Sequence, residues 1–426
     1  MSGLEPAQLV AAQRVAGWLR PAWVEVDLSA ITANVVHIRA AVAPSAVCAI
    51  VKADGYGHGA VPVARAALDG GAAYLGVALA EEGHELRQAG IEVPVLVLSE
   101  PPAEAMGLVV EDNLTATIYT DDGLAALLEA AALARPSRET GGRETGGRGT
   151  GGRGTGGRGT GGRGTGTWGR PVPVHLKVDT GMHRVGASPA AIVGLARRVA
   201  SHPALALEGL FTHLAVADEP DDPFTGAQLD RFEGVVRALA AEDIYPSMLH
   251  AANSAGALCH PRSRYQMVRP GMAVYGQAPA AALQAAPLIA PLQPALSLKA
   301  RVSYAKEVGA GESLSYGLQY RLSQRSVVAT VPVGYADGVP RRLFMVGGEV
   351  LVGGRRRTVA GAVTMDQILV DCGPGSEVTR GDEVVLLGRQ GDAEISPWEW
   401  AERLGTIAYE VTCGLSPRLP RLYTSR

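Results

Sequence analysis

Hydrophobic residues recur in two different patterns along the 426-residue chain, and the change falls near residue 290. Before it, short apolar runs alternate with longer stretches rich in alanine and leucine, which predicts strands alternating with helices in a parallel sheet. Strands are expected at 46–52, 73–79, 93–98, 114–119, 172–178, 206–213, 247–251 and 271–275. Helices are expected at 60–70, 79–89, 121–134, 188–201 and 224–242. Eight such units over roughly 250 residues favour a closed (β/α)8 barrel over an open doubly wound sheet.

After residue 290 the apolar runs become shorter and alternate with polar residues. Runs such as SVVATVPVG, QILVDCG and EVVLLG are separated by Gly, Pro and Asp turns, which predicts a mainly β domain over 290–426 with one helix near 397–404. An early strand at 22–28 follows an N-terminal extension (1–21) and fits no strand–helix alternation. We therefore expect a barrel domain over 22–289, with strand 22–28 pairing with the β domain.

A repetitive tract interrupts the barrel pattern. Residues 138–167 form six five-residue repeats of the RETGG and RGTGG type, with almost no apolar surface to bury, so we expect a disordered insertion over 136–168. Its GRGTGG stretch fits the dinucleotide motif G-x-G-x-x-G, but no strand precedes it and no helix follows. RNA binding by an RGG-like tract is disfavoured because the tract lies in mid-chain and has no aromatic residues.

Composition argues against several classes of protein. A net charge of −3 is unlike that of a general nucleic-acid binder, and the longest apolar runs are far too short to cross a membrane. The N-terminus lacks the apolar stretch of a signal peptide. The four cysteines have neither metal-ligand nor disulfide-framework spacing, so we expect no metal site and a reducing, cytoplasmic location.

Unusual polar residues follow the expected barrel strands, where the active sites of such barrels lie. They include Lys52, Lys177, Asp179, Arg184, His213, Asn253, Ser254 and Arg269. Taken singly, a lysine at the end of a strand is most often only solvated. Their occurrence together at one rim of the barrel indicates a site.

The stretch CAIVKADGYGHGA (48–60) narrows the chemistry. Its glycines expose backbone N–H groups that, with the hydroxyls of Tyr56 and Ser254, would suit a phosphate monoester. A phosphate-anchored ring beside Lys52 suggests pyridoxal phosphate held as a Schiff base. Burial in the barrel would lower the pKa of Lys52, which must lose its proton to act as nucleophile or base.

Motifs in a fixed order then identify a resemblance to alanine racemase, from about Trp23 to Arg421. They include VKADGYGHG (51–59), KVDTGMHRVG (177–186), THLAVADE (212–219), ANSAG (252–256), MVRPGMAVYG (267–276), SYG (315–317), GYADGVPRR (334–342), MDQ (365–367) and YEVTCGLSPRLPR (409–421). The resemblance implies the interconversion of L- and D-alanine, which supplies D-alanine for peptidoglycan. It also implies pyridoxal 5'-phosphate as cofactor and a head-to-tail homodimer with shared active sites.

The resemblance implies a role for individual residues. Lys52 would bind the cofactor and act as the base on the D-face, and Tyr316 of the partner subunit would be the base on the L-face, because racemisation needs proton transfer on both faces of Cα. The phosphate cradle would comprise Tyr56, Ser254, Gly271, Met272 and Tyr409. His213 would pack against the cofactor, and Arg269 would face its pyridine nitrogen and keep it unprotonated.

The remaining roles concern the substrate. Arg184 and the backbone N–H of Met365 would bind its carboxylate, and Lys177 corresponds to a lysine that is often carbamylated. The substrate entrance would comprise Asp218, Tyr335 and Arg341.

Three positions depart from the family pattern. Ala362 replaces a usual arginine near the substrate entrance, whereas His183 and Gly55 replace residues away from the expected chemistry. His58 is expected to support its loop rather than to react.

A fold-type III decarboxylase of basic amino acids is an alternative, but it would need a cysteine-centred motif in the β domain. A non-enzymatic pyridoxal-phosphate-binding protein of the same barrel type would lack a β domain.

Overall fold

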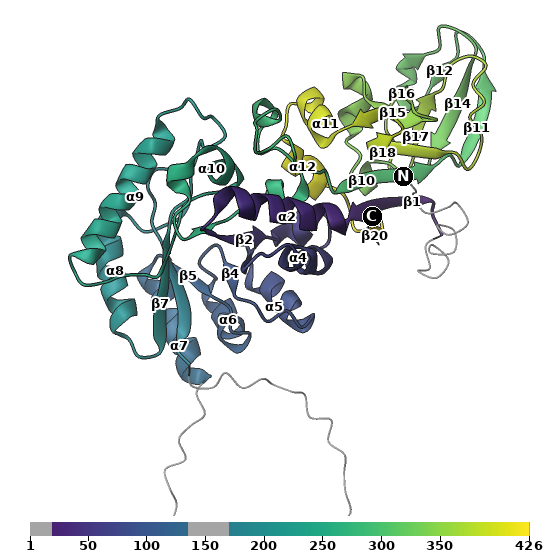
Figure 1. Cartoon of the computed structure of the whole chain (residues 1–426). Helices are drawn as coiled ribbons and strands as arrows, with labels where there is room; N and C mark the ends of the chain where they lie inside the picture. The colour runs from purple at the N-terminus through teal and green to yellow at the C-terminus, as the bar shows by residue number, and fades with distance from the viewer. Residues whose placement is uncertain (1–18, 135–169, 426) are drawn as a thin grey trace, which may run out of the picture.

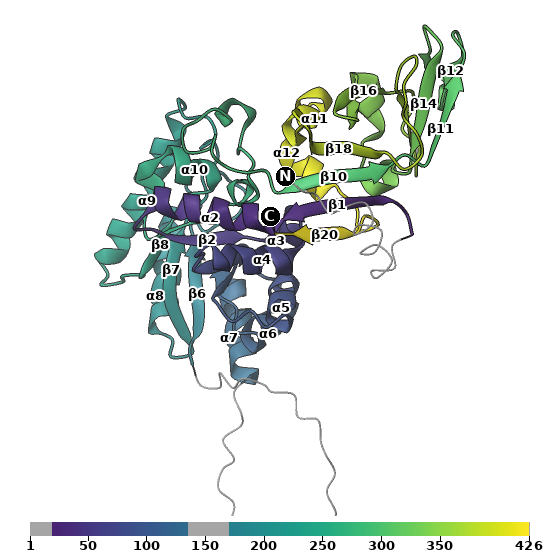
Figure 2. The same cartoon turned by 45° about the vertical axis from the view of Figure 1, so that its right-hand side comes forward.

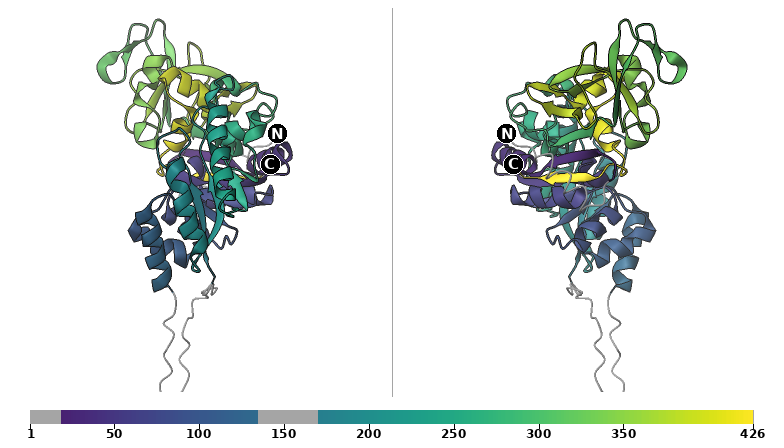
Figure 3. Two further views of the ribbon diagram at one scale, coloured as in Figure 1. Left: turned by 90° about the vertical axis from the view of Figure 1, so that its left-hand side faces the viewer. Right: turned by 90° about the vertical axis from the view of Figure 1, so that its right-hand side faces the viewer.

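The computed structural model describes residues 19–134 and 170–425. The insertion expected at 136–168 and most of the N-terminal extension lie outside the described residues. Figure 1 shows two parts, a purple-to-teal part built of alternating strands and helices and a green-to-yellow part built mainly of strands. The same two parts are stacked in both side views of Figure 3.

Parallel strands form the barrel of the first part. They are β2 (Ala46–Ile50), β3 (Tyr74–Val77), β4 (Val95–Val97), β5 (Ala116–Ile118), β6 (Val172–Lys177), β7 (Leu205–Phe211), β8 (Met248–His250) and β9 (Met267–Val268). They pair in the orders β4-β3-β2-β9 and β5-β6-β7-β8. The two sheets meet at a parallel bridge between Leu96 and Thr115, and on the other side the Arg269 N–H donates to the Ala252 carbonyl oxygen at 2.9 Å. The expected (β/α)8 barrel is therefore confirmed.

The eighth strand lies earlier in the sequence than expected. The expected strand at 271–275 is wrong, because Met272–Tyr275 form a 3-10 helix (η3) and the pairing strand is β9. All four residues of η3 are completely buried. A short, fully buried apolar run has no periodicity that separates a strand from a helical turn. As a consequence, Arg269 and Gly271 follow the strand and lie at the same barrel rim as Lys52.

Helices cover the outside of the barrel. They are α2 (Leu28–Val42), α4 (Ala60–Asp69), α5 (Ala80–Gln88), α6 (Met106–Glu111), α7 (Asp121–Leu133), α8 (Pro189–Ser201), α9 (Phe224–Ala240) and α10 (Ser254–Cys259). The five expected helices are confirmed, and side-chain caps fix some of their starts. Thr120 caps α7, and Ser188 caps α8 just before a proline at its first position. Figures 1 and 2 place α8 and α9 on one side of the barrel strands and α4–α6 on the other.

The second part is built on a ten-stranded sheet with the order β11-β14-β17-β16-β15-β18-β10-β1-β20, plus β19 beside β18. Its strands are β1 (Ala22–Asp27), β10 (Leu296–Arg301), β11 (Tyr304–Val308), β14 (Ser326–Val331), β15 (Glu349–Val352), β16 (Arg355–Val359), β17 (Ile368–Asp371), β18 (Glu383–Gln390), β19 (Ala393–Ile395) and β20 (Arg421–Thr424). A separate hairpin comprises β12 (Ser313–Leu314) and β13 (Tyr320–Arg321). The helices are α11 (Pro397–Leu404), as expected, and α12 (Ala408–Cys413).

Strand β1 connects the two parts. It pairs antiparallel with β10 and parallel with β20, and Figure 2 shows it between them. The chain then enters α2 directly, and the Asp27 carboxylate caps that helix by accepting from the N–H groups of Ser29 and Ala30. One cluster of buried side chains extends from the barrel into the β sheet. In the part of the chain that the structure describes, no helix is both long and apolar enough to cross a membrane.

Candidate active site

A left-handed turn follows the first barrel strand. The φ angles from residue 53 to residue 57 are all positive, between +50° and +82°, although Ala53, Asp54 and Tyr56 are not glycines. Each non-glycine residue in this conformation costs about 1–2 kcal/mol, so the turn must be stabilised by its surroundings. Gly57 is required because a Cβ there would lie 2.3 Å from the Thr412 carbonyl oxygen. The turn places Lys52 at its start and Tyr56 at its end, and both line one cavity.

One side chain of α5 and two side chains of the same loop hold this turn. The carboxylate of Glu82, on α5, accepts from the Ala53 N–H at 2.7 Å, and the Asp54 carboxylate accepts from the Ala60 N–H at 2.9 Å. His58 is buried, and burial lowers its pKa to about 4. Its neutral ring donates through Nδ1 to the Tyr56 carbonyl oxygen at 3.0 Å, because a carbonyl can only accept. These contacts agree with a supporting role for His58.

The cavity at this rim of the barrel has a volume of about 580 Å³. Among the residues expected in the site, those lining it are Lys52, Tyr56, Lys177, Arg184, His213, Ser254, Arg269, Gly271, Met272 and Tyr409. Sequence reasoning missed Ser99 and Cys413, which also line it. Ser99 comes two residues after β4, so its position beyond a barrel strand was a usable signal. Cys413 lies on α12 of the second part, and although the motif YEVTCGLSPRLPR (409–421) contains it, the resemblance gave it no role.

The cavity is cationic. Among the described residues that line it are two lysines and two arginines, but no aspartate or glutamate. Burial, and secondly the charge of Arg184, lower the pKa of Lys52. Burial, with Arg269 and Arg184, lowers the pKa of Lys177 to about 7. The site therefore favours an anionic ligand and contains amines that lose their protons readily.

Arg269 is buried in a fixed orientation. Its Nη2 donates to the carbonyl oxygens of Thr212 (2.8 Å) and Ala251 (3.1 Å) and to Nδ1 of His213 (3.2 Å), while Nη1 donates to Nδ1 of His250 (2.7 Å). A guanidinium only donates, so both histidine nitrogens must accept, and the low pKa values that burial gives these histidines agree with neutral rings.

The histidine contacts extend one residue further. With Nδ1 of His250 accepting, its proton is on Nε2, which donates to Nδ1 of His175 at 2.9 Å. Arg269 thus fixes the tautomers of a buried chain of histidines.

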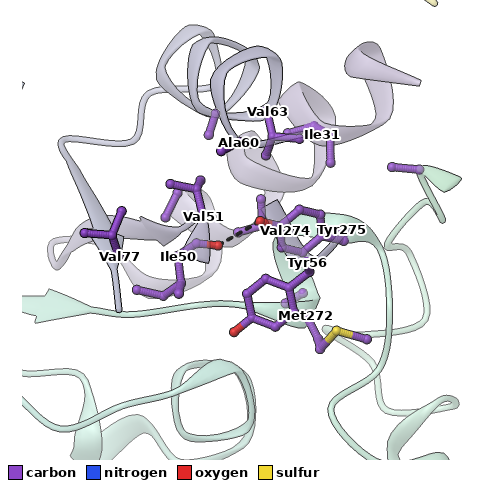
Figure 4. Packing of buried hydrophobic residues seen from close by; sticks show 14 of the residues in the cluster. Ile31, Ile50, Val51, Tyr56, Ala60, Val63, Val77, Met272, Val274 and Tyr275 are labelled. Carbon is purple, nitrogen blue, oxygen red and sulfur yellow. Dashed lines mark hydrogen bonds between the residues drawn. The ribbon is translucent and has the colours of Figure 1, made fainter. Parts of the chain in front are cut away.

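Hydroxyl and backbone N–H groups also line the cavity. Ser254 Oγ accepts from the Gly271 N–H at 2.9 Å and the Ala273 N–H at 3.3 Å. Gly271 leaves space for a tyrosine, because a Cβ there would lie 2.5 Å from the Tyr56 hydroxyl oxygen. The Tyr56 ring packs 4.9 Å from that of Tyr275, whose hydroxyl donates to the Ile50 carbonyl oxygen at 2.8 Å. Figure 4 shows this packing and the hydrogen bond.

Five expected residues do not line the cavity of this chain. They are Tyr316, Met365, Tyr335, Arg341 and Asp218. Tyr316 lies in a 3-10 helix (η5, Tyr316–Leu318) with 74% of its surface exposed, and Met365 is 53% exposed. The N–H of Tyr335 donates to the Thr364 carbonyl oxygen at 3.0 Å, so the loops carrying Tyr335 and Met365 bind each other. Asp218 lies nearer the cavity, where its charge helps burial to raise the pKa of Tyr409.

Two family models match the chain, one over the barrel part and one over the mainly β part. The family model "Alanine racemase, N-terminal domain" matches residues 26–279, and "Alanine racemase, C-terminal domain" matches residues 295–423. An alanine racemase of Symbiobacterium thermophilum is 44% identical over 406 residues, which cover 95% of this chain and 97% of that protein.

Solved structures give the same result. Alanine racemases from D-cycloserine-producing Streptomyces lavendulae and from E. faecalis each have a TM-score of 0.82, with identities of 35% and 38%. Both comparisons cover 96% of this chain, and 98% and 99% of the other chains. The chain therefore belongs to the alanine racemase family, a family of isomerases.

Proposed function

We propose that the chain interconverts L- and D-alanine with pyridoxal 5'-phosphate, using Lys52 and Tyr316 of the partner subunit as the two bases. The observation that carries the proposal is the cationic cavity, lined within the described chain by no carboxylate and containing a lysine whose pKa is lowered. Such a cavity suits a ligand with a phosphate and a substrate with a carboxylate. The product D-alanine would serve the synthesis of peptidoglycan.

The residues present fit this cofactor. Its phosphate would be held by the hydroxyls of Tyr56, Ser254 and Tyr409 and by the backbone of Gly271 and Met272, where the missing Cβ of Gly271 makes room. When bound, pyridoxal phosphate supplies an electron sink that makes the Cα proton of an amino acid acidic. Arg269 would face the ring nitrogen, and because a guanidinium does not give up its proton, that nitrogen would only accept.

Lys52 and Tyr316 would divide the proton transfers. The lowered pKa of Lys52 leaves its Nζ able to accept a proton from the D-face of Cα or to return one to it. The second base must reach the L-face, and Tyr316 lies outside the cavity of its own chain. Its 74% exposure leaves the hydroxyl free to enter another subunit's cavity. This supports a head-to-tail homodimer in which each cavity is completed by Tyr316 of the partner subunit.

The substrate carboxylate would be bound by Arg184 and by the backbone N–H of Met365 of the partner subunit. The amine of Lys177 donates to the Leu98 carbonyl oxygen at 3.3 Å, and burial, helped by the charge of Arg184, lowers its pKa. Carbamylation requires a neutral amine, and a pKa of about 7 leaves much of the Lys177 amine neutral at physiological pH. As a carbamate it would place an anion beside Arg184 and fix that guanidinium. The entrance would comprise Asp218, Tyr335 and Arg341.

The test uses the purified chain loaded with pyridoxal 5'-phosphate. L-alanine, D-alanine and basic amino acids are supplied in separate reactions, and the enantiomers and any released CO2 are measured over time. The proposal expects equilibration from either side without CO2 release, and no activity for Lys52→Ala. Release of CO2 from basic amino acids would favour a decarboxylase instead, and full racemase activity of Lys52→Ala would contradict the assignment of the base.

A further inference from the structure

The carboxylate of Glu82 joins two loops at the rim of the barrel. One oxygen, Oε1, accepts from the Ala53 N–H at 2.7 Å. The other, Oε2, accepts from the N–H groups of Ala78 at 2.8 Å and Leu79 at 3.2 Å, at the start of α5. The loop after β2 and the loop after β3 are therefore bound to the same side chain.

The first of these contacts is made at the start of the left-handed turn. Ala53 is the first of five consecutive residues with positive φ, and Lys52 immediately precedes it. A charged acceptor forms a hydrogen bond roughly twice as strong as a neutral one, so Glu82 can offset part of the conformational cost of the turn. Without it, the Ala53 N–H loses its side-chain acceptor, and the turn can relax toward the right-handed conformations that alanine and aspartate prefer.

Such a relaxation would displace both ends of the turn. Lys52 and Tyr56 line the cavity from those ends, one with the amine and the other with a hydroxyl. We propose that Glu82 is a positioning residue that holds the left-handed turn and thereby aims Lys52 and Tyr56 at the bound cofactor. The inference rests on the proposed function in that it takes pyridoxal phosphate to be the ligand of Lys52.

The neighbouring Glu81 provides a matched control. It carries the same charge in the same first turn of α5, is exposed, and its side chain has no hydrogen bond or ion pair to a described residue. Glu81→Ala and Glu82→Ala therefore remove the same charge from the N-terminus of α5, but only Glu82→Ala removes the contact with Ala53. Glu82→Gln retains one acceptor oxygen and turns an N–H group toward backbone donors, so it should also weaken the contact.

The experiment has two readouts on the full-length chain. Hydrogen exchange of the cofactor-free protein is followed in peptides covering 51–60, and cofactor affinity is titrated by the absorbance of protein-bound pyridoxal phosphate. For Glu82→Ala we expect exchange at least about tenfold faster in 51–60 and a Kd raised about tenfold, as the loss of one charge-assisted hydrogen bond implies. Glu82→Gln should change in the same direction, and Glu81→Ala should match the wild type.

Two results would overturn the inference. One is exchange in 51–60 that is the same in Glu82→Ala and Glu81→Ala. The other is faster exchange with unchanged cofactor affinity, which would reduce Glu82 to a cap of α5. If the wild-type chain bound no pyridoxal phosphate, the proposed function would fail, while the exchange data would still show whether Glu82 holds the turn.

Discussion

Arg20 is expected to stabilise the loop that carries Tyr335, one of the residues proposed for the substrate entrance, although Arg20 lies before the first strand. Its Nη1 and Nη2 lie 2.7 Å from Oδ2 and Oδ1 of Asp337, a residue with no exposed surface. Asp337 Oδ2 also accepts from the Gly334 N–H at 3.0 Å, and Arg418 Nε lies 3.6 Å from Oδ1. The perturbation is Arg20→Ala, which leaves a buried carboxylate without its bidentate partner.

The magnitude follows from these contacts. Removing one partner of a buried ion pair costs about 3–5 kcal/mol, and the more distant, half-exposed Arg418 should recover part of it, leaving about 2–4 kcal/mol. An unfolding entropy of about 2.1 cal/mol/K per residue gives roughly 0.9 kcal/mol/K for a chain of this length, so Tm should fall by about 2–4 °C. Asp337→Asn with Arg20→Ala should cost less than the sum of the two single changes, because no unpaired charge stays buried.

The assay is calorimetric unfolding of the four proteins of a double-mutant cycle: the wild type, Arg20→Ala, Asp337→Asn and the double variant. Arg389→Ala serves as control. Arg389 pairs with Glu394 at the surface, where such pairs contribute at most about 1 kcal/mol. Equal shifts in Tm for Arg20→Ala and Arg389→Ala, or strict additivity in the cycle, would refute the reasoning. Because Tyr335 lies on the same loop as Asp337, we also expect a raised KM for alanine.

Three further predictions concern the cavity and its surroundings. Gly271→Ala should weaken pyridoxal phosphate binding about tenfold in an absorbance titration, because its Cβ displaces the Tyr56 hydroxyl, whereas Gly194→Ala on the open face of α8 should not. Tyr275→Phe should lower Tm by about 1–3 °C by leaving the Ile50 carbonyl oxygen without its donor, and an unchanged Tm would contradict the importance of that bond. Burial lowers the pKa of the Lys177 amine from 10.5 in the unfolded chain to about 7 in the folded chain. Between these two pH values the unfolded state therefore binds more protons than the folded state. Stability of the cofactor-free chain should therefore rise with pH over that window, and Lys177→Met should flatten the slope of Tm against pH.

Much of the barrel could be predicted because its strands and helices differ in hydrophobic period. Strands such as β6 and helices such as α8 lie within two residues of their expected bounds. The eighth strand was misplaced because MAVY (272–275) is apolar throughout, so only tertiary packing decides that it forms a 3-10 turn. The left-handed turn at 53–57 was also beyond sequence reasoning, since its glycines allow it but Ala53, Asp54 and Tyr56 disfavour it.

The site could be predicted where its residues follow barrel strands, because the topology brings those loops together whatever their separation in sequence. Lys52 and Arg269 are more than two hundred residues apart and line the same cavity. The buried chain of hydrogen bonds from Arg269 to His250 and from His250 to His175 could not be predicted, because inward-facing histidines in strands look like ordinary core positions. Tyr316 was named only through the family resemblance, and its exposure in the single chain leaves its role to be tested between subunits.

The most direct test of the central claim mixes two inactive variants. Lys52→Ala removes one base and Tyr316→Phe the other, and each homodimer lacks a complete site. If Tyr316 acts in the cavity of the partner subunit, a heterodimer contains one intact site, and an equal mixture after subunit exchange should recover about a quarter of wild-type activity. Mixing that restores no activity, under conditions in which tagged subunits are shown to have exchanged, would contradict the shared site.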